Sequence, residues 1–135
     1  MKTIKGIFVI LFLSLVLAFA NFMLNCNRII FNPHEITFAQ ADLLPNKLLV
    51  VDARPKSEYK IGHIENAVNL PADDFENHLG DFLDVWQPEY AVLVYCKTSS
   101  ANDGASVAHK LKNELKIKNV FVLKEDWRKW KEQKR

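Results

Sequence analysis

Two unbroken apolar runs, LLVVDAR at residues 48–54 and YAVLVYC at residues 90–96, constrain this 135-residue chain more than any other feature. Each run is followed by polar, turn-forming residues, and such runs are typical of strands buried on both faces of a sheet. A strand of this kind needs helices above and below it, because either uncovered face would expose apolar side chains to water. The two runs therefore predict an α/β fold with a central parallel sheet.

The segments around these runs alternate between helical and strand patterns. We expect helices within residues 33–47, 55–64, 73–86 and 104–115, further strands at 67–71 and 119–123, and a final helix held by Trp127 and Trp130. Strands that alternate with helices of about ten residues predict right-handed crossovers and helices on both faces of one sheet. Ligand sites of such sheets form at the carboxyl ends of the strands. Cys96 ends one of the two apolar runs and so lies where a site is expected.

The N-terminal region has a different character, since no charged residue occurs from Gly6 to Asn27. As a helix, its apolar stretch up to Leu24 would span roughly 28 Å, close to the hydrocarbon thickness of a bilayer. We expect residues 1–27 to form an uncleaved signal anchor. Cleavage as a signal peptide near Ala20 is the main alternative, and lipidation at Cys26 is disfavoured by the residue before it. A buried core helix is not expected, because the run has no polar face.

Charge gives the expected topology and excludes one class of partner. Lys2 and Lys5 precede the apolar run, which predicts a single-pass inner-membrane protein whose domain (residues 35–135, after a linker at 28–34) is periplasmic. Without these two lysines, basic and acidic residues are equal in number at 16 each. This balance does not resemble a nucleic-acid-binding footprint, so no nucleic-acid partner is expected. The basic end of the chain, residues 128–135, is interpreted as the solvated end of the last helix.

The chain contains two cysteines, Cys26 and Cys96, which are too few and too far apart for a disulfide framework. An unpaired cysteine in an oxidising compartment is a liability unless its thiol chemistry is used or its sulfur is buried. Both interpretations of Cys96 remain open at this point: a presented nucleophile, or a small residue that ends a strand.

The segment Val50–Pro71 resembles the first signature of rhodanese-homology domains. The matching residues are Asp52, Arg54, Glu58, Tyr59, Gly62, His63, Ile64, Ala67, Asn69, Leu70 and Pro71. The later part of the chain is similar to the second half of the family pattern: it has VYC, then a loop and a helix, then KNVFVL followed by two tryptophans. The resemblance therefore covers about Glu35 to Glu132. It implies a three-layer rhodanese-like fold and sulfurtransferase activity through a cysteine persulfide. By position, that catalytic cysteine is Cys96, and no metal or organic cofactor is needed.

The resemblance also implies that the residues after Cys96 form the substrate-binding loop: Lys97, Thr98, Ser99, Ser100, Ala101, Asn102 and Asp103. A thiolate needs a positive environment, which backbone N–H groups of such a loop and a helix N-terminus supply. The hydroxyls at 98–100 either donate to sulfur or an oxyanion or are ordinary polar loop residues. The alternative, in which these residues form no catalytic site, is that Cys96 is a buried, inert cysteine.

The loop departs from the family pattern in three ways: it is about three residues longer, it contains no arginine, and its glycine, Gly104, comes late. Without a guanidinium to clamp phosphate oxygens, the phosphatase branch of the superfamily is disfavoured. Weak use of thiosulfate is expected, with Lys97 either donating a point charge or projecting away from the loop. Asp103 either caps a helix that begins near Gly104 or faces the sulfur and raises its pKa.

The remaining signature residues are expected to be mainly structural. Asp52 and Arg54 follow a strand and are predicted to pair, with tuning of the site as the alternative. His63 is predicted to fix a turn through a ring N–H bond and not to act as a base. Glu125 and Asp126 stand where the family usually has two glycines, which makes that turn bulkier and more acidic.

These observations together predict a membrane-tethered rhodanese-like sulfurtransferase that exchanges sulfur with a small molecule or a thiol protein. Two alternatives from other classes remain: a non-catalytic binding module of the same fold, and a thiol redox or sulfur sensor in which Cys96 is oxidised. The sequence does not define the donor, the acceptor or the oligomeric state.

Overall fold

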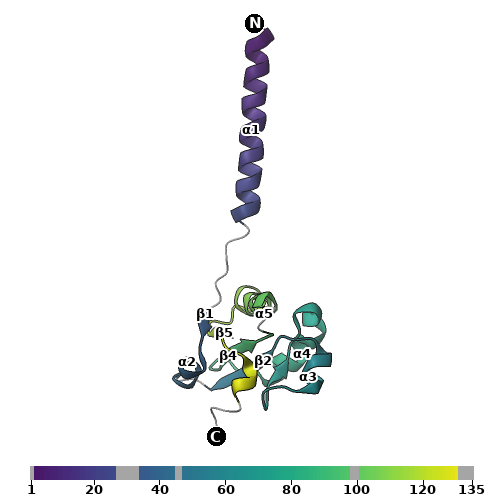
Figure 1. Cartoon of the computed structure of the whole chain (residues 1–135), viewed down its shortest axis with the longest axis vertical. Coiled ribbons are helices and arrows are strands. Elements are labelled where there is room, and N and C mark those ends of the chain that lie inside the picture. Colours follow the sequence, from purple (N-terminus) through teal and green to yellow (C-terminus); the bar gives the residue numbers. More distant parts are fainter. Residues whose placement is uncertain (1, 27–33, 45–46, 98–100, 131–135) are drawn as a thin grey trace. The chain divides into compact units, whose positions relative to one another are not determined.

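The computed structural model describes residues 2–26, 34–44, 47–97 and 101–130, with only the backbone described at 2–5, 21–26 and 101. The chain divides into two units, Met1–Phe31 and Asn32–Arg135, and each is treated by itself. The first unit contains helix α1 (Lys2–Cys26). The second contains the sheet and the remaining helices (Figure 1).

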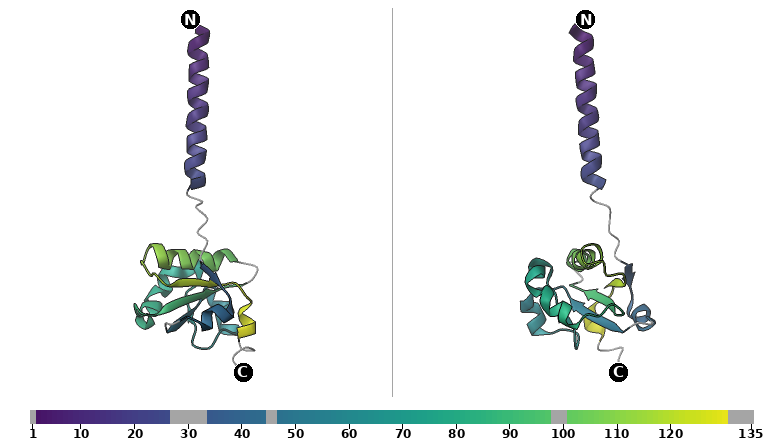
Figure 2. Two further views of the ribbon diagram at one scale, coloured as in Figure 1. Left: turned by 90° about the vertical axis from the view of Figure 1, so that its left-hand side faces the viewer. Right: turned by 180° about the vertical axis from the view of Figure 1, so that it is seen from behind.

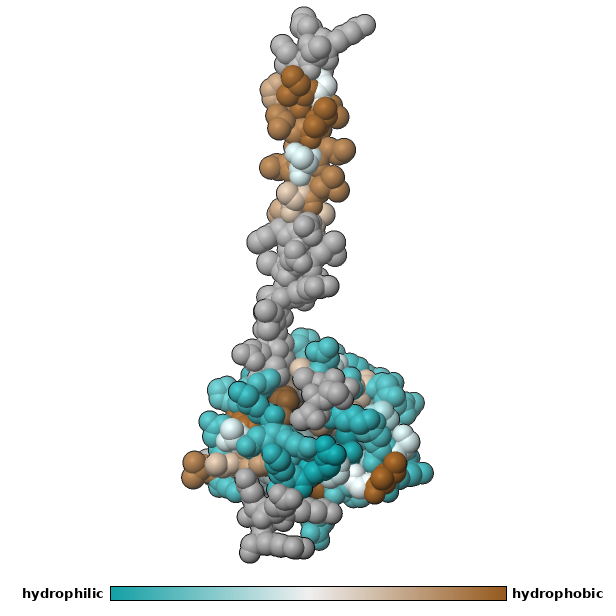
Figure 3. All heavy atoms as spheres, viewed as in Figure 1, coloured by the Kyte–Doolittle hydropathy of each residue, from teal (hydrophilic) through white to brown (hydrophobic). Residues whose placement is uncertain are grey.

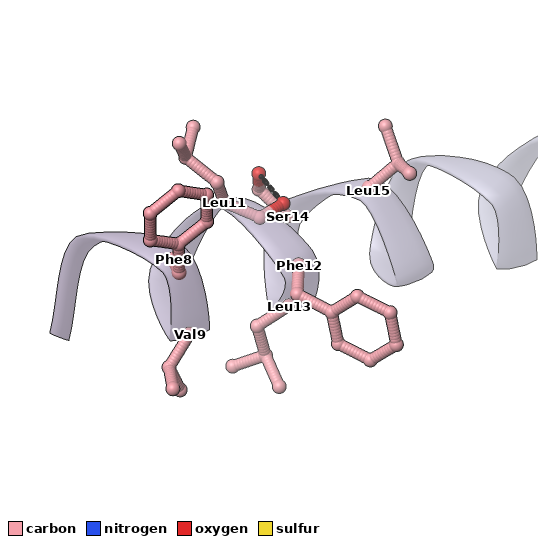
Figure 4. Close-up of a pocket in the computed structure, with 7 residues that line it drawn as sticks. All are labelled: Phe8, Val9, Leu11, Phe12, Leu13, Ser14 and Leu15. Atoms are coloured by element: carbon pink, nitrogen blue, oxygen red, sulfur yellow. Dashed lines mark hydrogen bonds between the residues drawn. The ribbon is translucent and has the colours of Figure 1, made fainter. Parts of the chain in front are cut away.

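Helix α1 carries large apolar side chains that are 47–70% exposed between Ile7 and Phe19. Figure 3 shows this part of the helix as mainly hydrophobic, and Figure 4 shows side chains from Phe8 to Leu15 pointing to different sides of it. Ser14 is the one polar residue drawn there, and its hydroxyl donates to the Leu11 carbonyl at 2.9 Å. Within the described stretches, no helix combines the length and the apolar character needed to cross a bilayer.

The second unit alternates strands and helices along the whole of its described length. In chain order its elements are β1 (His34–Ile36), α2 (Phe38–Asp42), β2 (Leu48–Asp52), α3 (Lys56–Ile61), β3 (Val68–Asn69), η1 (Ala72–Asp74), α4 (Phe75–Val85), β4 (Ala91–Tyr95), α5 (Ala101–Asn113), β5 (Val120–Leu123) and η2 (Trp127–Lys129). The five strands form one parallel sheet in the order β1-β5-β4-β2-β3. The predicted α/β fold with a central parallel sheet is confirmed.

The strand order fixes which helices share a face, because parallel crossovers are right-handed. The connection from β1 to β2 runs toward β3, and the connections from β3 to β4 and from β4 to β5 run the other way, so α2 lies on one face and α4 and α5 on the other. Figure 2 shows α5, in green, running along one face of the strands. The α2 face has a continuous core in which Val50 and Leu93 of the sheet join Phe38 and Trp130, whose rings meet edge to face at 5.3 Å.

The beginning of the domain differs from the sequence-based expectation. The helix predicted within residues 33–47 is present as α2, but the strand that precedes it, β1 at His34–Ile36, was not predicted and pairs with Phe121–Leu123. Three residues are too short to show strand alternation, so this edge strand had no sequence signal. Helix α2 then begins after Thr37, whose hydroxyl accepts from the Gln40 amide while the Gln40 side chain accepts from the Thr37 amide.

The helix that follows Cys96 and the end of the domain also differ from expectation. Helix α5 begins at Ala101 and not near Gly104, so Asp103 lies in its first turn. The prediction that Asp103 caps this helix is therefore wrong. Gly104 was interpreted as a helix boundary, but it lies inside α5, buried beside Cys96. At the end of the chain the 3₁₀ turn η2 leads into Trp130, which is helical and 8% exposed in the core, and the expected continuation of this last helix falls on residues 131–135, outside the described part of the chain.

Candidate active site

Cys96 is the first residue after β4, at the carboxyl edge of the sheet. Strand alternation places its side chain in phase with Val92 and Val94, toward the face covered by α5. A Cβ built on Gly104 would lie 3.0 Å from Sγ of Cys96 and 3.6 Å from Val122. The first turn of α5 can therefore approach the sulfur this closely only because residue 104 has no side chain.

The electrostatic environment of the Cys96 thiol is mixed. Burial raises the pKa of Cys96, and the negative charges of Asp103 and Asp52 raise it further. The Gly104 backbone N–H, which hydrogen-bonds the sulfur, and the Arg54 guanidinium act in the opposite direction, but the net shift is upward. The site thus has a thiolate-stabilising amide of the expected kind, while the thiol remains mostly protonated at neutral pH. Of the two expectations for Asp103, the one in which its charge raises the pKa of the thiol has the direction of this shift.

Beside the sulfur lies a buried polar network at the ends of β2 and β4. Asp52 is fully buried, and its carboxylate accepts two hydrogen bonds from the Arg54 guanidinium, at 3.0 and 2.6 Å. The same carboxylate accepts from the Tyr95 hydroxyl at 2.8 Å, and this hydroxyl accepts from the Ile64 amide at 3.1 Å. The network joins two strands to the segment after α3, so it holds the edge of the sheet in place.

Arg54 extends this network to η2. Its Nη2 donates to the Gly62 carbonyl at 2.7 Å, and its guanidinium carbon lies 4.3 Å from the ring centroid of Trp127. Burial acts to lower the pKa of Arg54, but the hydrogen bond and charge of Asp52 outweigh it and raise that pKa. Arg54 therefore stays fully charged although only 6% of its surface is exposed.

His63 makes its described contacts within its own turn. Its Nδ1 lies 2.8 Å from the Tyr59 carbonyl oxygen, and the rings of Tyr59 and His63 stack at 3.8 Å between centroids. The Tyr59 hydroxyl donates to the Ala67 carbonyl at 2.8 Å. These contacts connect α3 to the start of β3.

The predicted substrate-binding loop is described in part. Lys97 turns to α3, where its Nζ donates to Oε1 of Glu58 at 2.6 Å. Asn102 is exposed and Asp103 half-buried in the first turn of α5. Residues 98–100 and the side chain of Ala101 lie outside the described part of the chain, so the expectations for their hydroxyls and amides stay predictions.

A pocket of about 430 Å³ opens beside Lys97, between α3 and η2. It adjoins a smaller hollow of about 110 Å³, and both are lined by Arg54, Lys97, Trp127 and Arg128. We call this combined space the Arg54 pocket. It brings together three cationic side chains, one of which belongs to Lys97, the residue that follows Cys96.

Sequence reasoning named Arg54, Lys97 and Trp127, but it did not bring them together and did not single out Arg128. Glu58 was expected, like the other signature residues, to be mainly structural, and its carboxylate accepts from Lys97. The two residues are 39 positions apart, with Glu58 in α3 after β2 and Lys97 just after β4, and the pairing of β2 with β4 brings them together. A signal for this contact would have required the strand order, which the sequence did not provide.

Comparison with known proteins gives a family match over the domain. The family model described as "Rhodanese-like domain" matches residues 38–133. A tRNA uridine(34) hydroxylase of Yersinia enterocolitica is 39% identical over 75 residues, which cover 54% of this chain and 21% of that protein. This chain therefore matches about a fifth of the length of that curated relative.

Solved structures give the same fold at lower sequence identity. A protein of Bacillus halodurans matches with a TM-score of 0.58 and 21% identity, over 87% of this chain and 80% of that one. A single-domain sulfurtransferase of Saccharomyces cerevisiae matches with a TM-score of 0.53 and 23% identity, over 75% and 90%. A rhodanese-related protein of Thermoplasma volcanium matches with a TM-score of 0.52 and 20% identity, over 74% and 92%.

Proposed function

Because the chain belongs to the rhodanese-like domain family, we propose that it is a sulfurtransferase that carries sulfane sulfur as a persulfide on Cys96. The observation that carries the proposal is the close approach of α5 to the sulfur. Gly104 leaves room for Sγ, and its backbone N–H hydrogen-bonds the sulfur. A donor at this position favours an anionic sulfur, which both the attacking thiolate and the product persulfide carry.

The transfer needs no oxidant or reductant beyond the donor. The Cys96 thiolate attacks the sulfane sulfur of the donor, and a new S–S bond forms while the donor's own bond to that sulfur breaks. The leaving group departs with the electron pair, as sulfite from thiosulfate or as a thiolate from an organic persulfide. An acceptor thiolate then removes the outer sulfur and regenerates Cys96. The sulfurtransferase of similar fold from Saccharomyces cerevisiae supports this reaction class.

Intact mass measurement tests the proposal. The full chain incubated with a persulfide donor should gain one sulfur atom, about 32 Da, and the Cys96→Ser variant should not gain it. Cys26→Ser serves as the matched control and should still take up sulfur. Absence of the adduct in wild type with every donor would overturn the proposal.

One observation favours a second candidate, a non-catalytic binding module. The raised pKa of Cys96 leaves little thiolate at neutral pH, which slows attack on any donor. A wild-type thiol that stays unmodified by persulfides would support this candidate. Oxygen adducts or mixed disulfides in place of sulfur adducts would support a redox sensor instead.

Membrane tethering belongs to the same proposal. The uncharged stretch Gly6–Asn27, with Lys2 and Lys5 before it, supports a single-pass anchor that holds the domain on the periplasmic side. A C-terminal reporter that is active only in the periplasm should be active when fused to the chain. Activity of a cytoplasm-only reporter would contradict the orientation, and recovery of the shortened chain in the soluble fraction would indicate cleavage.

A further inference from the structure

Each cation that lines the Arg54 pocket has a carboxylate partner. Arg54 pairs with Asp52 at 2.6 Å, Lys97 with Glu58 at 2.6 Å, and Arg128 with Asp126 at 2.7 Å. The last pair lies within one turn, where Asp126 also accepts from the Arg128 amide. The pocket is therefore lined by three basic groups but has little net positive charge.

Glu58 differs from Asp52 and Asp126 in the number of pocket cations that its carboxylate faces. Its Oε1 binds Lys97 at 2.6 Å, and its Oε2 lies 3.9 Å from Nη1 of Arg54, so one carboxylate faces two of the three cations. Asp52 is fully buried in its own network, and Asp126 pairs with Arg128, two residues further along the chain. The Glu58 side chain is 26% exposed and lines the pocket itself.

This placement has a direct consequence for charged donors. A dianion such as thiosulfate that enters the pocket meets Lys97 already neutralised and approaches the Glu58 carboxylate, which repels it. A persulfide of an alkyl thiol carries at most one negative charge, so it is repelled less. The apolar ring of Trp127 and the exposed Ile61 offer such a donor contact surface at the same place.

We propose that Glu58 determines donor specificity: by neutralising Lys97 and facing Arg54 in the Arg54 pocket, it disfavours dianionic sulfur donors and favours alkyl persulfides. This inference rests on the proposed sulfur transfer at Cys96. The reaction is the same for both donors, since the thiolate forms an S–S bond to the sulfane sulfur and the leaving group takes the electron pair. Sulfite leaves from thiosulfate, and an alkyl thiolate leaves from the persulfide.

The test compares sulfur-adduct formation of the full chain with thiosulfate and with an alkyl persulfide. Glu58→Gln should raise the second-order rate constant for thiosulfate about threefold to fivefold, the scale set by one partly exposed ion pair. The rate with the alkyl persulfide should rise less, so the thiosulfate-to-persulfide ratio should increase at least about twofold. The gain should appear as a lower KM for thiosulfate with an unchanged maximal rate, and it should shrink at high salt.

Two further variants separate a specific role from a general charge effect. Glu76→Gln removes a carboxylate that pairs with Lys110 at 3.7 Å, outside the pocket, and should leave the ratio unchanged. Lys97→Gln removes the closer partner of Glu58 and leaves it only the 3.9 Å contact with Arg54, so it should lower the thiosulfate rate. The double variant with Glu58→Gln should restore that rate toward the wild-type value.

The outcomes distinguish the two proposals. No adduct on Cys96 with either donor overturns the proposed function itself. Adducts with an unchanged donor ratio in Glu58→Gln overturn the role of Glu58 and leave sulfur transfer standing. An equal rise in Glu58→Gln and Glu76→Gln would also overturn it, because the effect would then come from net charge alone.

Discussion

The sulfur of Cys96 lies so close to Gly104 that a Cβ on residue 104 would stand 3.0 Å from it. A Cβ contact of this length is tighter than most that occur in proteins, so the sulfur or the helix turn would have to move by a few tenths of an ångström. The absent side chain therefore sets how near the first turn of α5, with its backbone N–H, comes to the thiol.

Gly104→Ala should reduce the reactivity of Cys96 while the fold persists. The added methyl group displaces the sulfur or the helix turn and lengthens the N–H to sulfur contact, at a cost of about 1–3 kcal/mol in folding free energy. Better helix propensity offsets about 1 kcal/mol of that. Iodoacetamide alkylation of Cys96 in a Cys26→Ser background, together with urea unfolding, measures both effects.

Gly80→Ala is the matched control, because Gly80 also lies inside a helix but its added Cβ meets nothing within 4 Å. It should raise stability by up to about 1 kcal/mol and leave alkylation unchanged. Equal alkylation rates in the two alanine variants would contradict the proposed close approach.

The alkylation rate of Cys96 should rise with pH and reach its midpoint above the ordinary thiol value of about 8.5. Burial and the charges of Asp103 and Asp52 favour the neutral thiol, so a higher pH is needed to form the thiolate. Asp103→Asn removes one of these charges and should lower the midpoint, which raises the rate at neutral pH by about twofold to tenfold. Asp84→Asn, a substitution on the exposed side of α4, should not move the midpoint.

Asp52→Asn should destabilise the domain by about 3–5 kcal/mol, because it leaves the buried Arg54 guanidinium without its counter-charge. Asp126→Asn breaks a pair of similar geometry around Arg128, whose side chain is 71% exposed, and should change stability by less than about 1 kcal/mol. Denaturant midpoints of the two variants give the comparison. Similar midpoints would show that the buried pair contributes no more than the surface pair.

Tyr95→Phe should cost about 1–3 kcal/mol in folding free energy without removing a charge. The lost hydroxyl leaves the Ile64 amide without its acceptor and removes one hydrogen bond from the Asp52 carboxylate. Tyr90→Phe, at a half-buried position before β4, is the control and should be close to neutral. Hydrogen exchange of the Ile64 amide should accelerate in the first variant and not in the second.

Much of the fold followed from local patterns in the sequence. The apolar runs became β2 and β4, and the helix expected within residues 55–64 is α3. The failures came where local patterns were too short or were overridden. Strand β1 has three residues, and Gly104 marks a close contact inside α5 instead of its beginning.

The candidate site also has one part that could be predicted from the sequence and one part that could not. The sequence by itself determined that Cys96 stands at the carboxyl edge of a parallel sheet, because strand periodicity and right-handed crossovers are local, general constraints. Only the tertiary structure decided what surrounds the sulfur. The pairing of β2 with β4 brings Glu58 to Lys97, and the packing of η2 on Arg54 completes the pocket. Such contacts depend on which elements lie side by side, and no spacing along the chain encodes that.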